Sequence, residues 1–299
     1  MNQKKLLNLA LIFFIGVVLL IARNYWQQWQ QKQPNQYLQT ISKFNSDKTN
    51  SITIETKSVK LELTKQDNTW KIASQSADKA KVEELIKAFF PKNSPILLAE
   101  SKEQLENFAT TADYGKTVTL KNLDNQELTF FVGKENETNT GVAIKDQNKA
   151  YGIRNFPIIY LEPSQWYDLT ISQIPPVNIE KIVYEKNQQN FSVIKNDQNE
   201  WNFEGEELKT NSDAVAEFSK KFDNFNAQEI AFEKKLTEFN LNLPQFIITV
   251  KEKGGNETRL EFFQGNFDWL VKVQDKYFVI AKTDAEKFNI TKDKFIMAE

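Results

Sequence analysis

Apolar and polar residues alternate along several stretches of the chain, and two of these stretches resemble each other. They read SVKLELTKQDNTWKI (residues 58–72) and NFSVIKNDQNEWNF (residues 190–203). A period of two indicates a strand with one buried face, and the polar residues before each Trp favour a tight turn. Both stretches therefore predict a β-hairpin, with Trp70 and Trp201 on the returning strands, 131 positions apart.

Each predicted hairpin is followed by apolar residues at helical spacing. These are Val82, Leu85, Ile86 and Phe89 in the first stretch, and Val215, Phe218, Phe222 and Phe225 in the second. A spacing of three and four residues predicts an amphipathic helix with one face in the core. Asp78 is the expected N-cap of the first helix, and Asn211 or Ser212 that of the second.

Further correspondences follow in the same order. Leu105 and Phe108, in a predicted short helix, correspond to Leu236 and Phe239 at a spacing of 131. The segment 130–133 (FFVG) corresponds to 262–265 (FFQG) at 132, and Tyr151 corresponds to Tyr277 at 126. The order strand, strand, helix, helix and four strands thus occurs twice, which predicts two tandem copies of one β-rich module.

Antiparallel hairpins with helices grouped between them indicate an α+β fold. Pro175-Pro176 cannot continue a helix or a central strand, so we expect the seam between the modules there. The predicted modules cover residues 49–174 and 175–299.

The first 26 residues have the pattern of a membrane signal anchor. Lys4 and Lys5 precede an apolar run from Leu6 to Ala22 that only Asn8 interrupts. With the residues up to Trp26, this run is long enough to cross a bilayer. A cleaved signal peptide is the alternative, but bulky residues occupy the expected cleavage site. We expect a single-pass protein of the plasma (inner) membrane with a cytoplasmic N-terminus and a periplasmic or other extracytoplasmic bulk.

Residues 27–48 begin with a Gln-rich stretch and are interpreted as a tether. The composition of the whole chain excludes several kinds of chemistry. The 299 residues contain no His and no Cys, which rules out imidazole bases, thiolate nucleophiles and Cys/His zinc sites. The net charge is -2 and the chain has no basic stripe, so nucleic-acid binding is not expected.

No catalytic, cofactor-binding or metal-binding residue is assigned. Two acidic stretches, Glu204 to Glu207 and Asp197 to Glu200, lack the ligand spacing of a calcium loop and are interpreted as solvated turns. Most aromatic residues follow the core periodicity. Phe267 and Trp269, in the loop after Gly265, break it and are the candidates for a surface aromatic contact.

The segment LTEFNLNLPQFIITVKEKGGNETRLEFFQG (residues 236–265) resembles the bacterial domain of unknown function 4340 family. Phe239, Leu241, Asn242, Pro244 and Gly265 occupy the positions of its pattern, whereas Asn240 stands at a Gly position. The first copy keeps Phe108 and Gly133. The resemblance covers about residues 50 to 295 and carries no catalytic residue. It implies a membrane-anchored extracytoplasmic factor associated with ABC transporters of the gliding-motility or auxiliary type.

Three functions are considered. The first is a non-enzymatic, membrane-anchored interaction module, an accessory subunit of an ABC-transporter-like membrane complex. The second is a lipid- or polysaccharide-binding protein that uses a cleft between the modules near Pro175-Pro176. The third is a hydrolase with two carboxylates about 5 to 10 Å apart, for which the sequence has no motif. We favour the interaction module.

Overall fold

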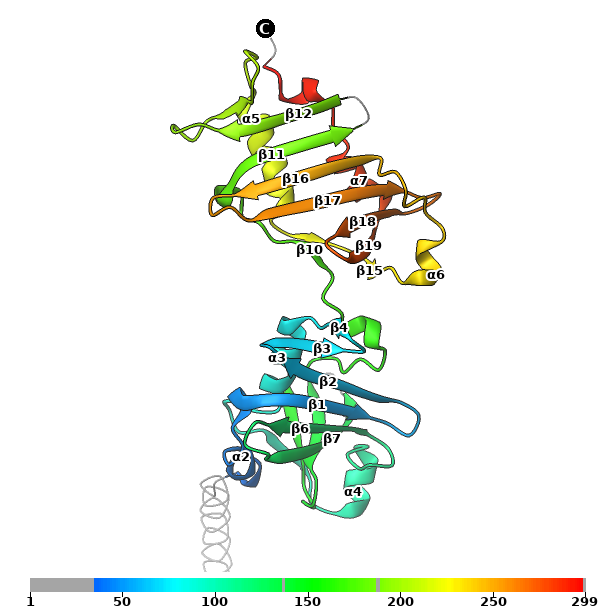
Figure 1. The fold of residues 1–299 in the computed structure, drawn as a ribbon. Helices are drawn as coiled ribbons and strands as arrows, with labels where there is room; N and C mark the ends of the chain where they lie inside the picture. Colours follow the sequence, from blue (N-terminus) through cyan, green and yellow to red (C-terminus); the bar gives the residue numbers. More distant parts are fainter. Residues whose placement is uncertain (1–34, 136–137, 187–188, 298–299) are drawn as a thin grey trace, which may run out of the picture. The chain divides into compact units, whose positions relative to one another are not determined.

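The computed structural model describes residues 35–135, 138–186 and 189–297, and these divide into two compact units (Figure 1). Unit 1 ends at Pro163 and unit 2 begins at Ser164. Each unit is built on an antiparallel sheet with a few short helices, so the predicted α+β class is confirmed.

Among the described residues, the sheet of unit 1 has the strand order β4-β3-β2-β1-β6-β7-β8-β9-β5. All its neighbouring strands are antiparallel. The strands are β1 (Thr49–Glu55), β2 (Lys60–Gln66), β3 (Thr69–Ile72), β4 (Gln75–Ser76), β5 (Ile96–Ala99), β6 (Lys116–Asn122), β7 (Glu127–Glu135), β8 (Asn139–Ile144) and β9 (Ala150–Arg154).

The helices of unit 1 are α2 (Gln36–Ile41), α3 (Lys79–Ala88) and α4 (Lys102–Asn107). Asp78 caps α3 by accepting hydrogen bonds from two backbone N–H groups, as its sequence predicts. The buried face of α3 leads to Phe89, whose ring stacks on Phe130 of β7 at 4.2 Å between centroids. This contact joins the helix to the core side of the sheet.

The sheet of unit 2 has the order β13-β12-β11-β16-β17-β18-β19-β15 within the described residues. Its strands are β11 (Ile179–Lys186), β12 (Gln189–Lys195), β13 (Trp201–Phe203), β15 (Glu229–Ile230), β16 (Phe246–Glu252), β17 (Glu257–Gln264), β18 (Trp269–Val273) and β19 (Lys276–Ile280). A small sheet pairs β10 (Thr170–Ser172) with β14 (Phe225–Asn226). The helices are α5 (Ser212–Ser219), which Asn211 caps, α6 (Glu233–Leu236) and α7 (Lys282–Phe288).

Apart from the edge strand β4, the two sheets repeat one topology, and the pairing of their strands aligns the two units residue by residue. Ile52 of β1 pairs with Leu63 and Leu120, and Ile182 of β11 pairs with Val193 and Val250. Each residue of the second set lies 130 positions after its counterpart. Both sheets also have a register shift at the same place, after Thr49 in β1 and after Ile179 in β11. The sequence interpretation missed β1 and β11, which are interior strands of the two sheets.

The register confirms the match between Trp70 and Trp201. Trp70 pairs with Lys65 on β2, and Trp201 pairs with Lys195 on β12, again 130 positions after Lys65. Both indole rings are buried, with 2% and 4% of their surface exposed. Each Trp therefore packs its side chain into the core of its own unit.

Two other predicted matches are wrong. Val118 pairs with Phe130, whereas its counterpart Ile248 pairs with Leu260, so Phe130 corresponds to Leu260 and not to Phe262. A shift of two residues along a strand keeps every side chain on the same face, so the alternation does not reveal it.

The other incorrect match is that of Tyr151 with Tyr277. Val142 of β8 pairs with Tyr151, and its counterpart Val271 of β18 pairs with Phe278. Tyr151 and Phe278 are both buried at 3% exposure. Tyr277 lies one residue earlier and points to the other face of the sheet.

The unit boundaries also differ from the predicted ones. Residues 35–48, part of the predicted tether, belong to unit 1, where Tyr37 of α2 is fully buried and its ring lies 5.3 Å from that of Tyr151. Residues 164–174, predicted to end module 1, belong to unit 2. There the backbone N–H of Ile174 donates to the carbonyl of Phe222.

The predicted membrane anchor, from residue 6 to residue 22, lies outside the described residues. Within the part of the chain that the structure describes, no helix has the length and hydropathy of a membrane span.

Candidate functional site

The outer face of β2 and β3 in unit 1 contains a depression of about 540 Å³. Leu61 and Leu63 of β2 point into the core, so the residues between and beside them point outward. The residues that line the depression are Lys60, Leu61, Glu62, Thr64, Gln66, Lys71, Ile72, Ala73, Ser74 and Pro163. Strand alternation on β2, with the adjoining β3–β4 turn, thus gathers a mostly polar surface.

The charged groups of this depression are not engaged in ion pairs within the part of the chain that the structure describes. Among the described residues, Lys60, Glu62 and Lys71 form no ion pair with one another or with other side chains. The lining holds two ammonium groups and one carboxylate, Glu62, so it lacks the carboxylate pair that glycoside hydrolysis uses. These groups can bind polar or anionic groups of a partner without first breaking an internal contact.

The equivalent face of unit 2 has different chemistry. By strand register, Ser192 stands in place of Glu62, Ile194 in place of Thr64, and Asn202 in place of Lys71. The polar groups of this second face are engaged internally rather than left open.

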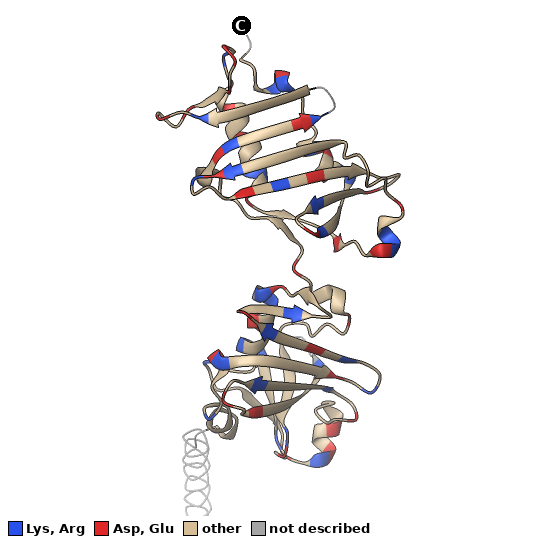
Figure 2. Cartoon of the chain, viewed as in Figure 1, with Lys and Arg blue, Asp and Glu red and all other residues tan. Residues whose placement is uncertain are grey.

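Glu204 lies at the centre of these internal contacts in unit 2. It accepts hydrogen bonds from Lys181 at 2.5 Å and from Ser192 at 2.6 Å. The hydrogen bond from Lys181, followed by that from Ser192, lowers the pKa of Glu204. Further along the sheet, Arg259 bridges Glu185 at 3.4 Å and Glu261 at 3.1 Å. The strands of this sheet carry charges of both signs (Figure 2). The two units therefore share a topology, but the chemistry of their equivalent faces differs.

The acidic stretches singled out in the sequence lie in and beside turns. Glu204 is tied to Lys181, Glu206 forms an ion pair with Lys292, and the backbone N–H of Glu200 donates to the side chain of Asn196. The described residues contain no group of three or more carboxylates placed to hold a metal ion.

The two aromatic candidates for a surface contact differ in exposure. Phe267 has 88% of its surface exposed, so its predicted accessibility is confirmed. The prediction for Trp269 is wrong: it is 4% exposed, and its ring lies 5.8 Å from that of Phe246. Trp269 is the first residue of β18, and strand alternation places its side chain in the core.

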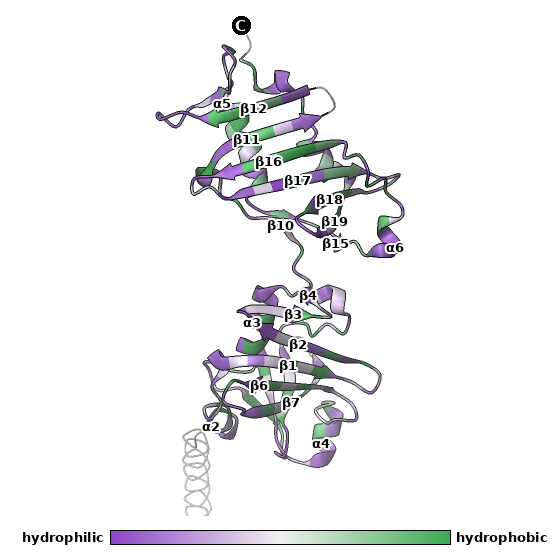
Figure 3. Cartoon of the chain, viewed as in Figure 1, coloured by the Kyte–Doolittle hydropathy of each residue, from purple (hydrophilic) through white to green (hydrophobic). Residues whose placement is uncertain are grey.

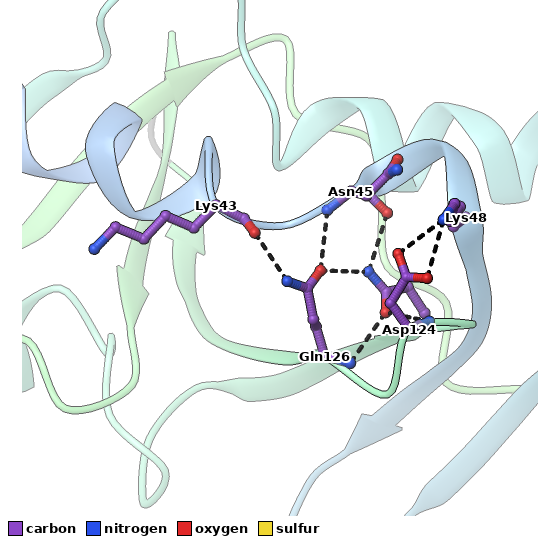
Figure 4. A network of polar contacts seen from close by, with 6 residues as sticks. Lys43, Asn45, Lys48, Asp124 and Gln126 are labelled. Atoms are coloured by element: carbon purple, nitrogen blue, oxygen red, sulfur yellow. Dashed lines mark hydrogen bonds and ion pairs between the residues drawn. The ribbon is translucent and has the colours of Figure 1, made fainter.

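A polar network in unit 1, which the sequence did not suggest, has a structural role (Figure 4). The carboxamide oxygen of the buried Asn122 accepts hydrogen bonds from the backbone N–H groups of Asp124 and Gln126, both at 3.0 Å. Its amide group donates to the carbonyl oxygen of Asn45 and to the side-chain oxygen of Gln126. The Gln126 amide group in turn donates to the carbonyl of Lys43, and Lys48 pairs with Asp124.

Because every strong contact of this network is internal, it fastens residues 43–48 to the turn between β6 and β7. The sequence signal for such a network is weak, since its partners are about 80 positions apart.

The candidate residues Lys60, Glu62 and Lys71 were also missed. Their only signal in the sequence is their outward position on predicted strands, which they share with many other charged residues. What distinguishes them is that they line one depression together, and that depends on the fold.

The comparisons with known proteins give a family and nothing more specific. No match was found among curated proteins or among solved structures. The family model described as "Domain of unknown function (DUF4340)" matches residues 70–244, which include most of unit 1 and the first half of unit 2. The match covers more than half of the chain, and the protein therefore belongs to this family of domains of unknown function.

Proposed function

We propose that the protein is a non-enzymatic interaction module, held at the extracytoplasmic side of the plasma membrane by residues 6–22. In this proposal it is an accessory subunit of a membrane complex of the ABC-transporter type. The observation that carries the proposal is the depression in unit 1, which gathers Lys60, Glu62 and Lys71 with no ion pair to any other described residue.

The difference between the two units supports this assignment. Unit 2 engages the polar groups of the equivalent face in hydrogen bonds and ion pairs, so its charges already have partners. On the equivalent face of unit 1, Lys60 and Lys71 form no ion pair with the other described residues. Unpaired charges at such a site favour rapid and specific association with a partner of complementary charge. We therefore place the contact for an acidic segment of a membrane-protein partner on unit 1.

The membrane part of the proposal has separate support. The run from residue 6 to residue 22 has the composition of a signal anchor. The chain also belongs to the family whose resemblance implies an association with ABC transporters. An anchored module with an open polar face is suited to contact the extracytoplasmic loops of a permease.

Purification of the full-length protein from native membranes in mild detergent tests the proposal. We expect an ABC-type permease and its ATPase to co-purify. The variant Lys60→Glu/Lys71→Glu should retain much less of them, because it reverses the two free positive charges. Lys92→Glu/Lys145→Glu makes the same charge change at exposed positions elsewhere on unit 1 and should have no effect.

Recovery of the protein without any membrane partner would count against the proposed function. Equal recovery of the partner with both double variants would instead remove the depression as the contact surface.

A further inference from the structure

Two large apolar side chains are exposed at one end of the sheet of unit 2. Phe267, in the turn between β17 and β18, is 88% exposed, and Leu243, in the loop between α6 and β16, is 69% exposed. The start of β16 pairs with the end of β17 through Phe246 and Phe262. The loop and the turn therefore leave the sheet on the same side (Figure 1).

The turn that carries Phe267 is held firmly against the core. Gly265 packs so closely on Phe239 that a Cβ atom at this position would lie 2.5 Å from the Phe239 ring. The backbone N–H of Gly265 also donates to the carbonyl of Asp268 at 3.0 Å. Because the turn is closely packed and closed by this hydrogen bond, Phe267 loses less conformational entropy when a partner binds.

Helix α6 and the loop after it are fastened to the same turn. Lys235 of α6 forms ion pairs with Asp268 at 3.2 Å and with Glu238 at 3.0 Å. The backbone N–H of Gln245, two residues after Leu243, donates to the carbonyl of Phe262 at 2.8 Å. The loop that carries Leu243 and the turn that carries Phe267 are thus held to the same end of the sheet.

The core beneath is complete without the exposed residues. It consists of a buried cluster whose members are Ala231, Phe239, Phe263, Leu270 and Val279. Figure 3 shows the hydrophobic colouring of β16 and of the end of β17. Neither Phe267 nor Leu243 belongs to this cluster, so neither is needed to fill it.

The charges around this end of the sheet identify the kind of partner. Glu233, Glu238 and Asp268 outnumber Lys234 and Lys235, and Lys235 is already paired with two of these acids. Figure 2 shows both signs of charge on α6. A slightly acidic surface is repelled by anionic lipid headgroups, which attract clusters of free Lys and Arg. It is compatible with a protein cleft that has an apolar floor and a neutral or basic rim.

We propose that Phe267 and Leu243 form a docking tip that inserts into an apolar cleft of a membrane-protein partner. This inference rests on the proposed function and adds a second contact, on unit 2, to the one assigned to unit 1. Exposed aromatic anchors on a rigid support have the character of interface hot spots, where a few side chains contribute most of the binding energy.

Site-specific photo-crosslinking in the full-length protein in native membranes tests the docking tip. The photoreactive residue p-benzoylphenylalanine replaces Phe267, Leu243, Lys71 or Leu123 one at a time. Leu123 is the matched control, because it is 68% exposed in a turn of unit 1 outside both proposed contacts. We expect positions 267 and 243 to crosslink to the same membrane protein, and position 123 to give no such product.

A second measurement uses the partner identified by that crosslink. Phe267→Ala/Leu243→Ala should weaken its retention at least tenfold while leaving the thermal unfolding midpoint unchanged, because both side chains are exposed. Leu123→Ala/Ile158→Ala removes two similarly exposed side chains from unit 1 and should leave retention unchanged.

The outcomes separate the docking tip from the proposed function. A protein crosslink from position 71 but none from 267 and 243 would overturn the tip and leave the function standing. Products at 267 that contain lipid only, or a second copy of this chain, would also overturn the tip. If no position yields a protein partner, both the tip and the proposed function are wrong.

Discussion

At the scale of single residues, Lys221 of unit 2 is placed in surroundings that disfavour its charge. Its ammonium group lies 4.9 Å from the centre of the Phe218 ring and donates to the carbonyl of Lys287 in α7. Burial, and then the nearby charges of Lys294 and Lys287, lower its pKa to about 8. The hydrogen bond and the ring contact orient the side chain, but they do not offset the free-energy cost of burying its charge.

This pKa predicts how the stability of unit 2 changes with pH. The ordinary pKa of a Lys side chain is 10.5, so between about pH 8 and 10.5 the unfolded chain binds a proton at residue 221 that the folded protein does not. The free energy of unfolding should therefore rise with pH across this window, with no contribution from Lys221 to the slope below it. Urea unfolding at a series of pH values measures the slope.

Lys221→Met should reduce that rise, whereas Lys220→Met, at an exposed neighbour paired with Glu217, should keep it. Parallel profiles for the wild type and Lys221→Met would show that Lys221 does not titrate in this range.

At the scale of elements, helices and hairpins follow local patterns, and the sequence predicts them well. Asp78 caps α3 as expected, and the turn at Asp67-Asn68 has positive φ at both residues, the pattern of a tight type I′ hairpin turn. The short strands β5 and β15 were missed, because they occur between helices and are strands only through pairing with β9 and β19. Such pairing partners lie about 50 positions away and leave no periodic signal.

The turn between β6 and β7 gives a prediction at this scale. Asn122→Ala should lower the free energy of unfolding of unit 1 by about 2 to 4 kcal/mol, because it removes the hydrogen bonds that the buried Asn122 side chain makes to Asn45, Asp124 and Gln126. Lys48→Met removes only the exposed ion pair with Asp124 and should cost less than about 1 kcal/mol. Denaturant unfolding of both variants tests this, and equal losses would contradict the assigned role of Asn122.

At the scale of the whole molecule, the sequence predicts two modules but misplaces their limits. The module boundary was expected at Pro175-Pro176, because two prolines interrupt regular structure. The chain divides at Pro163 instead, since the intervening residues include β10, which pairs with β14 of unit 2. In that segment Ile171 is buried, and the Ser172 hydroxyl donates to the carbonyl of Phe222 at 2.8 Å.

Fragments with different starting points test this boundary. A fragment of residues 164–299 should unfold in one cooperative transition. A fragment of residues 175–299 lacks β10 and should be less stable by several kcal/mol, because it exposes the apolar surface that Ile171 covers and loses the pairing with β14. Circular dichroism during urea unfolding compares the two, and equal midpoints would place the boundary at Pro175.

The sequence by itself determined the α+β class, the repeated order of hairpins and helices, the core role of Trp70 and Trp201, and the family resemblance. These depend on periodicity and turn chemistry, which are local properties of the chain. The predicted anchor and the proposed partner remain predictions.

Only the tertiary structure decided the strand register, the unit boundary, the burial of Trp269 beside the exposed Phe267, and which lysines lack a partner. Each of these depends on contacts between residues far apart in the chain. A strand moved by two positions keeps the same alternation, so one sequence pattern is compatible with several registers until packing selects one.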